Sequence, residues 1–343
     1  MAIARYRLSR RAALGLAGAT AGSVLVPFPG KSARAQTLDK VSYLTSWRAQ
    51  AEHGGFYQAV AAGIYKKYGI ECDVRQGGPQ LSASQMLLGG RIDMIMSSGL
   101  EALNYAKEDV PFFCIGSIFQ KDPQVLIGHA GAGNDSFEKL KGKTILVGAI
   151  GRVTYWPFLK AKYGYSDEQL RPYTFNLAPF MADKNLVQQG FISSEPFAMR
   201  QQGADPVPLL IASAGYDNYN TTIAISKKMA TEKKDLVQRF VTASLEGWAE
   251  YLKGGAIAEP ANALIRKDNP DMTDDKIVYA IKVMNEMGMV RSGDAETLGI
   301  GAMTDTRWQH FYDSMVEVGV LPKGLDPKKA YSLEFVNKGV GRA

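Results

Sequence analysis

The stretch VSYLTSWRAQAEHGGFYQAVAAGIYKKYGIECDVR, residues 41–75, decides the fold class. Apolar runs at 41–46 and 70–75 have the length and composition of buried strands. Between these runs, apolar residues recur at every fourth position, as on one face of a helix; they are Phe56, Val60, Ile64 and Tyr68. The stretch therefore predicts a strand, a helix and a second strand, the repeating unit of an α/β fold.

The same alternation continues along the chain. Further strands are predicted at 92–96, 112–119, 125–128, 144–147, 173–175, 191–193, 208–212 and 222–226. Helices are predicted at 81–88, 100–106, 136–140, 156–163, 182–189, after Pro196, and at 236–252, 260–267, 274–287 and 305–318. Because alternating strands and helices are joined by crossover connections, we expect mostly parallel sheets.

Length and pattern together indicate two lobes. About 308 residues remain after an export leader is removed, more than one core usually organises. We predict lobe 1 from 36–121 plus 222–343 and lobe 2 from 122–221, because the terminal helices cannot bury their apolar faces alone. The predicted fold is the α/β type II periplasmic binding protein fold: two doubly wound lobes, a two-strand hinge near 120–122 and 217–222, and a ligand cleft between the lobes.

The first 35 residues are typical of a cleaved export signal peptide. Arginines precede a mildly apolar run at 12–26, and a small-x-small site ends at Ala35, where we predict the cut. The run SRRAAL at 9–14 resembles a twin-arginine signal and favours the Tat route over the Sec route. The apolar run has 15 residues, whereas a membrane-spanning helix needs roughly 20. We therefore expect a protein released into the periplasm.

The leader also accounts for the basic character of the chain. It holds six of the 40 Lys and Arg residues and none of the 34 Asp and Glu residues, so the remainder carries equal numbers of both signs. No basic stripe with interleaved aromatic residues is present in the sequence. Nucleic acid is therefore not an expected partner.

Cysteine and histidine are too few and too scattered to predict a metal site. The two cysteines, Cys72 and Cys114, each lie in a predicted strand, and the sequence leaves open whether they pair. The three histidines are His53, His129 and His310.

Four segments carry a family resemblance: SWRAQAEHGGFYQAVAAGIYKKYGIECDV at 46–74, GGRIDMIMSS at 89–98, FEKLKGKTILVG at 137–148 and GFISSEPFAMRQQG at 190–203. Each segment is weak alone, but their order and spacing are specific. Together they resemble the type II periplasmic solute-binding proteins of importers for nitrate, sulfonates, taurine and thiamine precursors. These proteins share their fold with yeast thiamine-pyrimidine synthases.

The resemblance covers nearly all of 36–343 and carries several expectations. It implies two lobes that close over a small solute, with the permease and ATPase of an ABC transporter as partners. It also implies a monomer with no bound cofactor or metal.

Polar and aromatic side chains follow the first predicted strand, where a ligand cleft is expected. Trp47 offers a flat apolar face, and Gln50 and His53 offer hydrogen-bonding groups at the edge of a ring. The alternative is that Trp47 and Tyr57 belong to the core of the lobe. His53 matches the family's His-x-x-x-Tyr position, which favours ligand contact.

The equivalent loops after other strands supply further candidates. Ser97 and Ser98 end a strand, where they bind a ligand or cap the next helix. In the second lobe the corresponding candidates are Gly151, Arg152 and Thr154, after Gly148. Arg152 pairs with an anionic group or is solvated at the surface.

Glu195 lies in the most informative short motif, SEP at 194–196. Its carboxylate is suited to accept hydrogen bonds from an amino or imide N–H; alternatively it is a helix N-terminal acid favoured by the helix dipole. Tyr216 and Tyr219, next to the second crossing, close an aromatic cage or cover the hinge.

These residues favour a neutral or amino-bearing heterocycle, such as a pyrimidine thiamine precursor or a flavin-like ring. Taurine-type sulfonates and aromatic carboxylates remain alternatives, because Arg48 and Arg152 are suited to anions. We do not expect an enzyme: the cysteine-rich motif of the yeast synthases is missing, and no Gly-x-Ser-x-Gly, His-Glu-x-x-His or P-loop motif is present. A periplasmic sensor that binds the same solute stays open.

Overall fold

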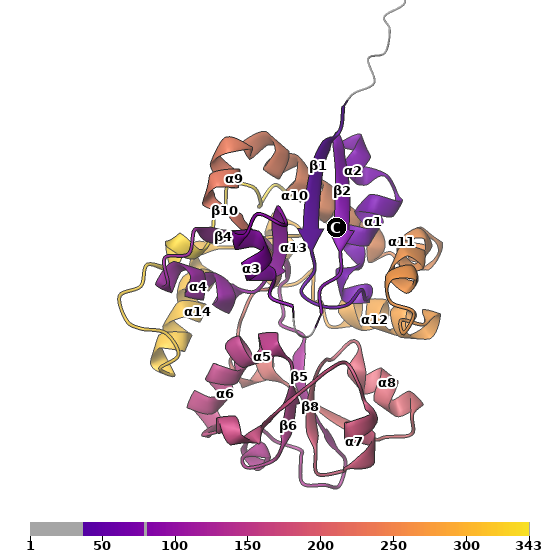
Figure 1. The fold of residues 1–343 in the computed structure, drawn as a ribbon, viewed down its shortest axis with the longest axis vertical. Helices are drawn as coiled ribbons and strands as arrows, with labels where there is room; N and C mark the ends of the chain where they lie inside the picture. The colour runs from indigo at the N-terminus through magenta and orange to yellow at the C-terminus, as the bar shows by residue number, and fades with distance from the viewer. Residues whose placement is uncertain (1–36, 79–80, 343) are drawn as a thin grey trace, which may run out of the picture. The chain divides into compact units, whose positions relative to one another are not determined.

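The computed structural model describes residues 37–78 and 81–342. The predicted leader and its cut after Ala35 lie outside the described residues. Residues Thr37–Ala343 form one compact unit. Within it, ten strands form two separate five-stranded sheets with helices around them (Figure 1), which confirms the predicted α/β class with two lobes.

The first sheet has the order β2-β1-β3-β10-β4. Its strands are β1 (Asp39–Leu44), β2 (Ile70–Arg75), β3 (Met94–Ser97), β4 (Phe112–Phe119) and β10 (Asn220–Ser226). The second sheet has the order β7-β6-β8-β5-β9. Its strands are β5 (Gln124–His129), β6 (Ile145–Val147), β7 (Leu170–Pro172), β8 (Val187–Phe191) and β9 (Pro206–Leu210). Where each lobe begins and ends along the chain stays a prediction.

One strand of each sheet is antiparallel, so the sheets are mixed. In the first sheet β10 runs antiparallel to both neighbours, β3 and β4. In the second sheet β5 runs antiparallel to β8 and β9. These are the two strands that follow a crossing from the other lobe. The chain enters β5 and β10 at the edge of the sheet that faces the other lobe, whereas the remaining strands end at that edge. The direction of β5 and β10 is therefore reversed.

The helices pack around these sheets (Figure 1). They are α1 (Gly54–Ala61), α2 (Ile64–Lys67), α3 (Ala83–Leu88), α4 (Gly99–Lys107), α5 (Ala149–Val153), α6 (Tyr155–Tyr163), α7 (Ala178–Ala182), α8 (Glu195–Gln201), α9 (Lys227–Glu232), α10 (Lys234–Tyr251), α11 (Gly255–Asp268), α12 (Asp274–Glu286), α13 (Asp294–Leu298) and α14 (Asp305–Glu317). The terminal helices return to the first lobe: a Cβ at Gly55 of α1 would lie 2.1 Å from Trp248 Cγ of α10. Only glycine permits so close a contact between these helices.

Three parts of the predicted secondary structure differ from the structure. The helix predicted at 182–189 is wrong, because α7 ends at Ala182 and residues 187–189 lie in strand β8. Glutamine favours helices, but Gln188 and Gln189 lie in a buried strand that pairs with β5 and β6, and tertiary pairing overrides this preference. The strand predicted at 173–175 lies at 170–172. The single helix predicted after β1 is split into α1 and α2 at Gly63, whose φ of 68° is left-handed.

The two cysteines are unpaired. Cys72 lies on β2 and Cys114 on β4, the opposite edges of the first sheet. Four strand spacings of about 4.8 Å separate them, far more than a disulfide spans. Cys114 instead donates a hydrogen bond to Thr222 Oγ1 at 3.1 Å.

A buried carboxylate joins the two crossings between the lobes. Asp122, in the first crossing, is 2% exposed. Its Oδ2 accepts hydrogen bonds from the side-chain amides of Asn218 and Asn220, both at 2.9 Å, and its Oδ1 accepts one from the Gln124 N–H at 2.9 Å. Arg307 of α14 donates to the carbonyl of Gln120 in the same crossing. The hinge is therefore held by hydrogen bonds rather than by apolar packing alone.

We predict that Asp122→Ala lowers the free energy of unfolding by about 2–4 kcal/mol, because three buried donors lose their acceptor. Urea unfolding followed by circular dichroism measures this loss. Asp73→Ala, at an exposed carboxylate paired with Arg75, is the control and should cost much less. Equal losses in the two variants would contradict the role given to Asp122.

Candidate functional site

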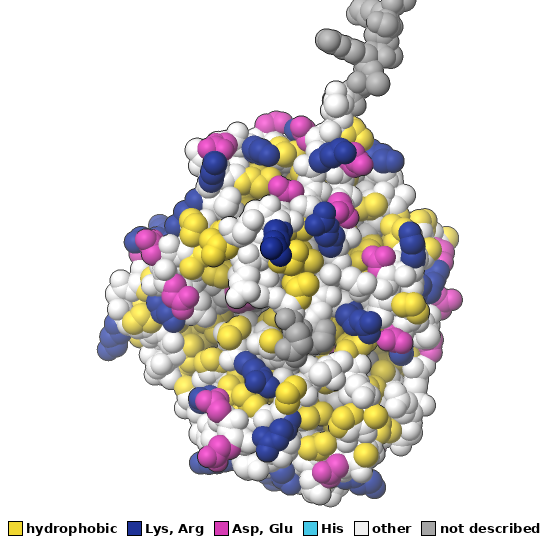
Figure 2. Space-filling model, viewed as in Figure 1, with side chains coloured by type: hydrophobic (Ala, Val, Ile, Leu, Met, Phe, Trp, Pro, Cys, Tyr) yellow, Lys and Arg dark blue, Asp and Glu magenta, His cyan; other side chains and the backbone are white. Residues whose placement is uncertain are grey.

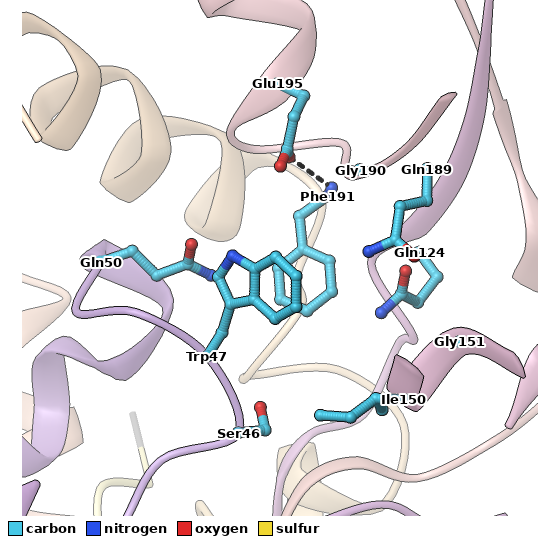
Figure 3. Close-up of a pocket in the computed structure, with 10 residues that line it drawn as sticks. All are labelled: Ser46, Trp47, Gln50, Gln124, Ile150, Gly151, Gln189, Gly190, Phe191 and Glu195. Atoms are coloured by element: carbon cyan, nitrogen blue, oxygen red, sulfur yellow. Dashed lines mark hydrogen bonds between the residues drawn. The ribbon is translucent and has the colours of Figure 1, made fainter. Parts of the chain in front are cut away.

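A cavity lies between the two sheets, at the carboxyl ends of β1, β6 and β8 (Figure 3). It encloses about 430 Å³ of empty space, part of which opens to solvent. Its lining residues are Ser46, Trp47, Gln50, Gln124, Ile150, Gly151, Gln189, Gly190, Phe191 and Glu195. The first lobe contributes only the loop after β1, and the second lobe contributes the rest. This is the edge at which open α/β sheets bind ligands.

Trp47 reaches from the first lobe onto the second. A Cβ at Gly148 would lie 3.2 Å from Trp47 Cη2, so the indole lies directly on the backbone at the start of α5. The indole also stacks on Tyr173, with ring centroids 6.0 Å apart and planes 14° apart, and meets Phe175 edge-on at 6.2 Å. Trp47 therefore forms one wall of the cavity and part of the contact between the lobes.

Glu195 is the only charged side chain among the ten lining residues. It is buried, its Oε2 accepts a hydrogen bond from the Phe191 N–H at 2.8 Å, and its Oε1 accepts one from the Tyr173 hydroxyl at 3.2 Å. Burial above all, with a smaller contribution from the nearby carboxylate of Glu52, raises its pKa from 4.5 to about 7, although the hydrogen bonds that it accepts oppose the rise. Near neutral pH Glu195 is therefore present both as a carboxylate, which only accepts hydrogen bonds, and as a carboxylic acid, which also donates one.

Three glutamine amides provide the remaining polar chemistry. Gln189 Oε1 accepts from the Gly148 N–H at 2.6 Å and the Tyr155 hydroxyl at 2.9 Å, which leaves its amide N–H groups for the cavity. Gln124 Oε1 is buried and finds no hydrogen-bond donor among the described residues. Figure 3 shows the amide ends of Gln124 and Gln189 pointing into the space beside Trp47, with Gln50 on the other side. The cavity thus offers both donors and acceptors.

Further contacts between the lobes lie beside the cavity. Ser193, just before α8, donates a hydrogen bond to the buried carboxylate of Glu52 in the first lobe. Phe197 of α8 stacks on Tyr279 of α12, with centroids 4.4 Å apart. The pKa of Glu52 is raised by burial. The lobes are therefore in contact along this side of the cleft.

Four of the predicted site residues line the cavity: Trp47, Gln50, Gly151 and Glu195. Thr154 is buried, and its hydroxyl donates to the Ile150 carbonyl at 2.9 Å, within its own helix. Arg152 is exposed and lines a different groove, together with Trp156 and Lys160. Neither Thr154 nor Arg152 reaches the cavity.

The other candidates of the first lobe are buried away from the cavity. Burial lowers the pKa of His53 to about 3, so its imidazole is neutral. Tyr57 donates to Asp268 Oδ2 at 2.9 Å. Ser97 and Ser98 donate to Glu101 Oε2 at 3.3 and 3.0 Å, and Ser98 caps α4. None of these four lines the cavity.

Tyr216 and Tyr219 lie at the hinge rather than at the cavity. Tyr216 is fully buried between Phe158 and Phe311, with ring centroids 5.2 and 5.4 Å away. Tyr219 donates to Asp294, and the Arg307 guanidinium lies 4.2 Å from its ring centroid. Neither tyrosine is among the ten residues that line the cavity.

Six lining residues were not among the sequence candidates: Ser46, Gln124, Ile150, Gln189, Gly190 and Phe191. Gln189 was missed because its segment was predicted as a helix. Gln124 is not predicted because it begins β5, the strand that follows the first crossing. The search for site residues considers the loops after the carboxyl ends of strands, and Gln124 lies at the amino end of its strand. The one feature of the sequence that could have indicated Gln189 is the polar pair at 188–189, which directly precedes the apolar residues predicted as a strand at 191–193.

Charge is evenly distributed on the face shown in Figure 2, where acidic and basic side chains are interspersed. Within the described residues, no group of three or more His, Cys, Asp or Glu side chains is placed to hold a metal ion. No helix in that part of the chain is long and apolar enough to cross a membrane.

Residues 50–263 match the family model described as NMT1/THI5 like, which covers more than half of the chain. The chain belongs to this family. The riboflavin-binding protein RibY of Chloroflexus aurantiacus is 25% identical over 312 residues, which cover 88% of each protein. A 4-amino-5-hydroxymethyl-2-methylpyrimidine phosphate synthase of Schizosaccharomyces pombe is 27% identical over 131 residues, 38% of each protein.

The fold is that of periplasmic binding proteins. The periplasmic aliphatic sulphonate binding protein SsuA of Escherichia coli superimposes with a TM-score of 0.57 at 13% identity, over 85% of this chain and 91% of that one. The expected family and two-lobe fold are thus confirmed. Because the family contains both binding proteins and synthases, the role of this chain depends on its site.

We predict that Glu195 makes the stability depend on pH. Its pKa is higher in the folded state than in the unfolded state, so its contribution is complete below about pH 4.5 and is lost as the pH rises through 7. Between pH 5 and 8 the free energy of unfolding should therefore fall more steeply in the native protein than in Glu195→Gln, by up to about 3 kcal/mol. Urea titrations at several pH values measure this; parallel curves would contradict the prediction.

Proposed function

We propose that this protein captures a small heteroaromatic solute, a pyrimidine or a flavin-like ring, for an ABC importer. The observation that carries the proposal is the cavity between the lobes, which combines the Trp47 ring, one carboxylate and three amides. The similarity to a riboflavin-binding protein along 88% of both chains supports the same class of ring. The leader pattern supports a periplasmic location, with a permease and an ATPase as partners.

The cavity chemistry explains the preference for a neutral ring. A planar heterocycle gains apolar contact with the indole of Trp47, and its edge meets the free amide groups of Gln124 and Gln189. Glu195, with a pKa of about 7, accepts from a ring N–H or donates to a ring acceptor. A sulfonate or carboxylate would instead face this acidic group, with no Lys or Arg among the ten lining residues to pair with it.

A bound ring would also stabilise the closed form of the protein. Trp47 and Gln50 come from the first lobe, whereas Gln124, Gln189 and Glu195 come from the second. A ligand that contacts both groups binds the closed form more tightly than the open one, and so shifts the population toward closure. Such closure is the signal that a permease would recognise.

Binding is better supported than catalysis. The ten lining residues include no Cys, His or Lys, so Glu195 is the one side chain among them suited to act as a general base, and it has no thiolate, imidazole or amine beside it. The synthase relatives match only part of their length. A sensor that binds the same solute would have the same cavity, and a sensor kinase gene beside this one would favour that role over transport.

We predict that one class of ring raises the melting temperature of the refolded protein. Unfolding and refolding first removes any solute carried through purification. A ligand at 100 times its Kd adds about 2.7 kcal/mol to the free energy of unfolding. The panel contains pyrimidines, thiamine, riboflavin, taurine, alkyl sulfonates, nitrate and aromatic acids. A shift with sulfonates or acids but no ring would overturn the proposed solute class.

We predict that Trp47→Ala and Glu195→Ala each weaken ring binding by about 30-fold or more, because each removes a central contact worth about 2 kcal/mol. Isothermal titration calorimetry with the ligand found by the panel measures the loss. Arg152→Ala is the matched control: the residue lies outside the cavity and its loss should leave affinity unchanged. A large effect of Arg152→Ala with little effect of the other two would contradict the proposed site.

A further inference from the structure

A second cavity adjoins the first on the far side of Glu195. It holds about 800 Å³ of empty space, part of it open to solvent. It is lined by Tyr173, Phe175, Ser194, Glu195, Gln202 and Lys276, with Asn176 and Asp271 at its edge and the remainder small or apolar. Glu195 is a lining residue of both cavities. We call the two the inner cavity and the outer cavity.

Tyr173, Glu195 and Trp47 lie where the two cavities meet. The Tyr173 hydroxyl bonds to Glu195 Oε1, and Trp47 stacks on the Tyr173 ring. A ring bound beside Trp47 in the inner cavity therefore lies next to this boundary. A substituent on the ring that takes over the hydrogen bond between Tyr173 and Glu195 would pass into the outer cavity.

The outer cavity is polar, and it has one cation, Lys276, among its lining residues. Lys276 Nζ donates to the Asp271 carbonyl at 2.8 Å, and Arg48 bonds to the Asp271 carboxylate at 3.3 Å. The Ser194 hydroxyl and the Gln202 amide are left unused by the hydrogen bonds among the described residues. Single donors and acceptors spread along a wall suit hydroxyl groups, which both donate and accept. A phosphate would need several convergent cations.

We propose that the solute is a heteroaromatic ring that carries a neutral polyhydroxylated chain, with the ring in the inner cavity and the chain in the outer cavity. This inference rests on the proposed function and narrows it. Gln202 and Ser194 are then specificity residues for the chain, whereas Trp47 and Glu195 hold the ring. A simple pyrimidine fills only the inner cavity and leaves the outer one to solvent.

Two flavins that differ only in the chain test this inference. Riboflavin has the ring with a ribityl chain, and lumiflavin has the same ring with a methyl group in its place. Quenching of flavin fluorescence by the purified protein should show riboflavin binding at least 10-fold more tightly than lumiflavin. Gln202→Ala should weaken riboflavin binding by about 3- to 10-fold, the effect of one lost hydrogen bond, and leave lumiflavin binding unchanged.

Gln201→Ala is the matched control. Gln201 precedes Gln202 on the same helix and is also exposed, but it bonds to Asp275 and does not line the outer cavity. It should leave the affinity for both flavins unchanged. A loss of riboflavin binding in Gln201→Ala as large as in Gln202→Ala would overturn the assignment of the outer cavity.

The outcomes separate this inference from the proposed function. Equal affinities for riboflavin and lumiflavin would overturn the role of the outer cavity but leave ring capture standing. Tighter binding of the phosphorylated flavin FMN than of riboflavin would overturn a neutral chain. Failure of both riboflavin and lumiflavin to bind would remove the flavin ring itself, and with it this inference.

Discussion

The hydrogen bonds of the Asp122 carboxylate are the constraint on which the two-lobe arrangement depends. Three donors from both crossings converge on this one buried group. An ionisable group is costly to bury unless its oxygens are fully used, so the site tolerates little change. By holding the two crossings together, Asp122 holds the two sheets in place relative to each other. No strand of one sheet pairs with a strand of the other.

The mixed sheets follow from the same constraint. Each crossing delivers the chain to the edge of a sheet that faces the cleft, and the next strand must start there. The strands β5 and β10 are therefore reversed, and each lies between parallel strands in its sheet. The remaining strands still end at the cleft, so their following loops supply Trp47, Gly151 and Glu195 to one cavity.

The character of the cavity is set by what is buried near Glu195. Its oxygens are held by the Phe191 N–H and the Tyr173 hydroxyl, and its pKa is raised by burial. Among the lining residues no cation is present to offset this acid, and the other polar side chains are three amides and the hydroxyl of Ser46. The relatives of this chain include both a binding protein and synthases, which is why the site and not the fold carries the proposal.

The amino-acid sequence by itself determined the α/β class, the two lobes and the edge at which the site lies. These depend on local periodicity and on the rule that loops after strands meet at one edge, so Trp47, Gln50, Gly151 and Glu195 could be found without coordinates. Only the tertiary structure decided which side chains are free to face a ligand. His53, Ser97 and Tyr216 have suitable chemistry, but the packing of the chain buries them away from the cavity. Gln124 and Gln189, by contrast, line the cavity because one begins a reversed strand and the other lies in a strand that local preference predicts as helix. Long-range pairing and burial set these outcomes, and no local pattern records them.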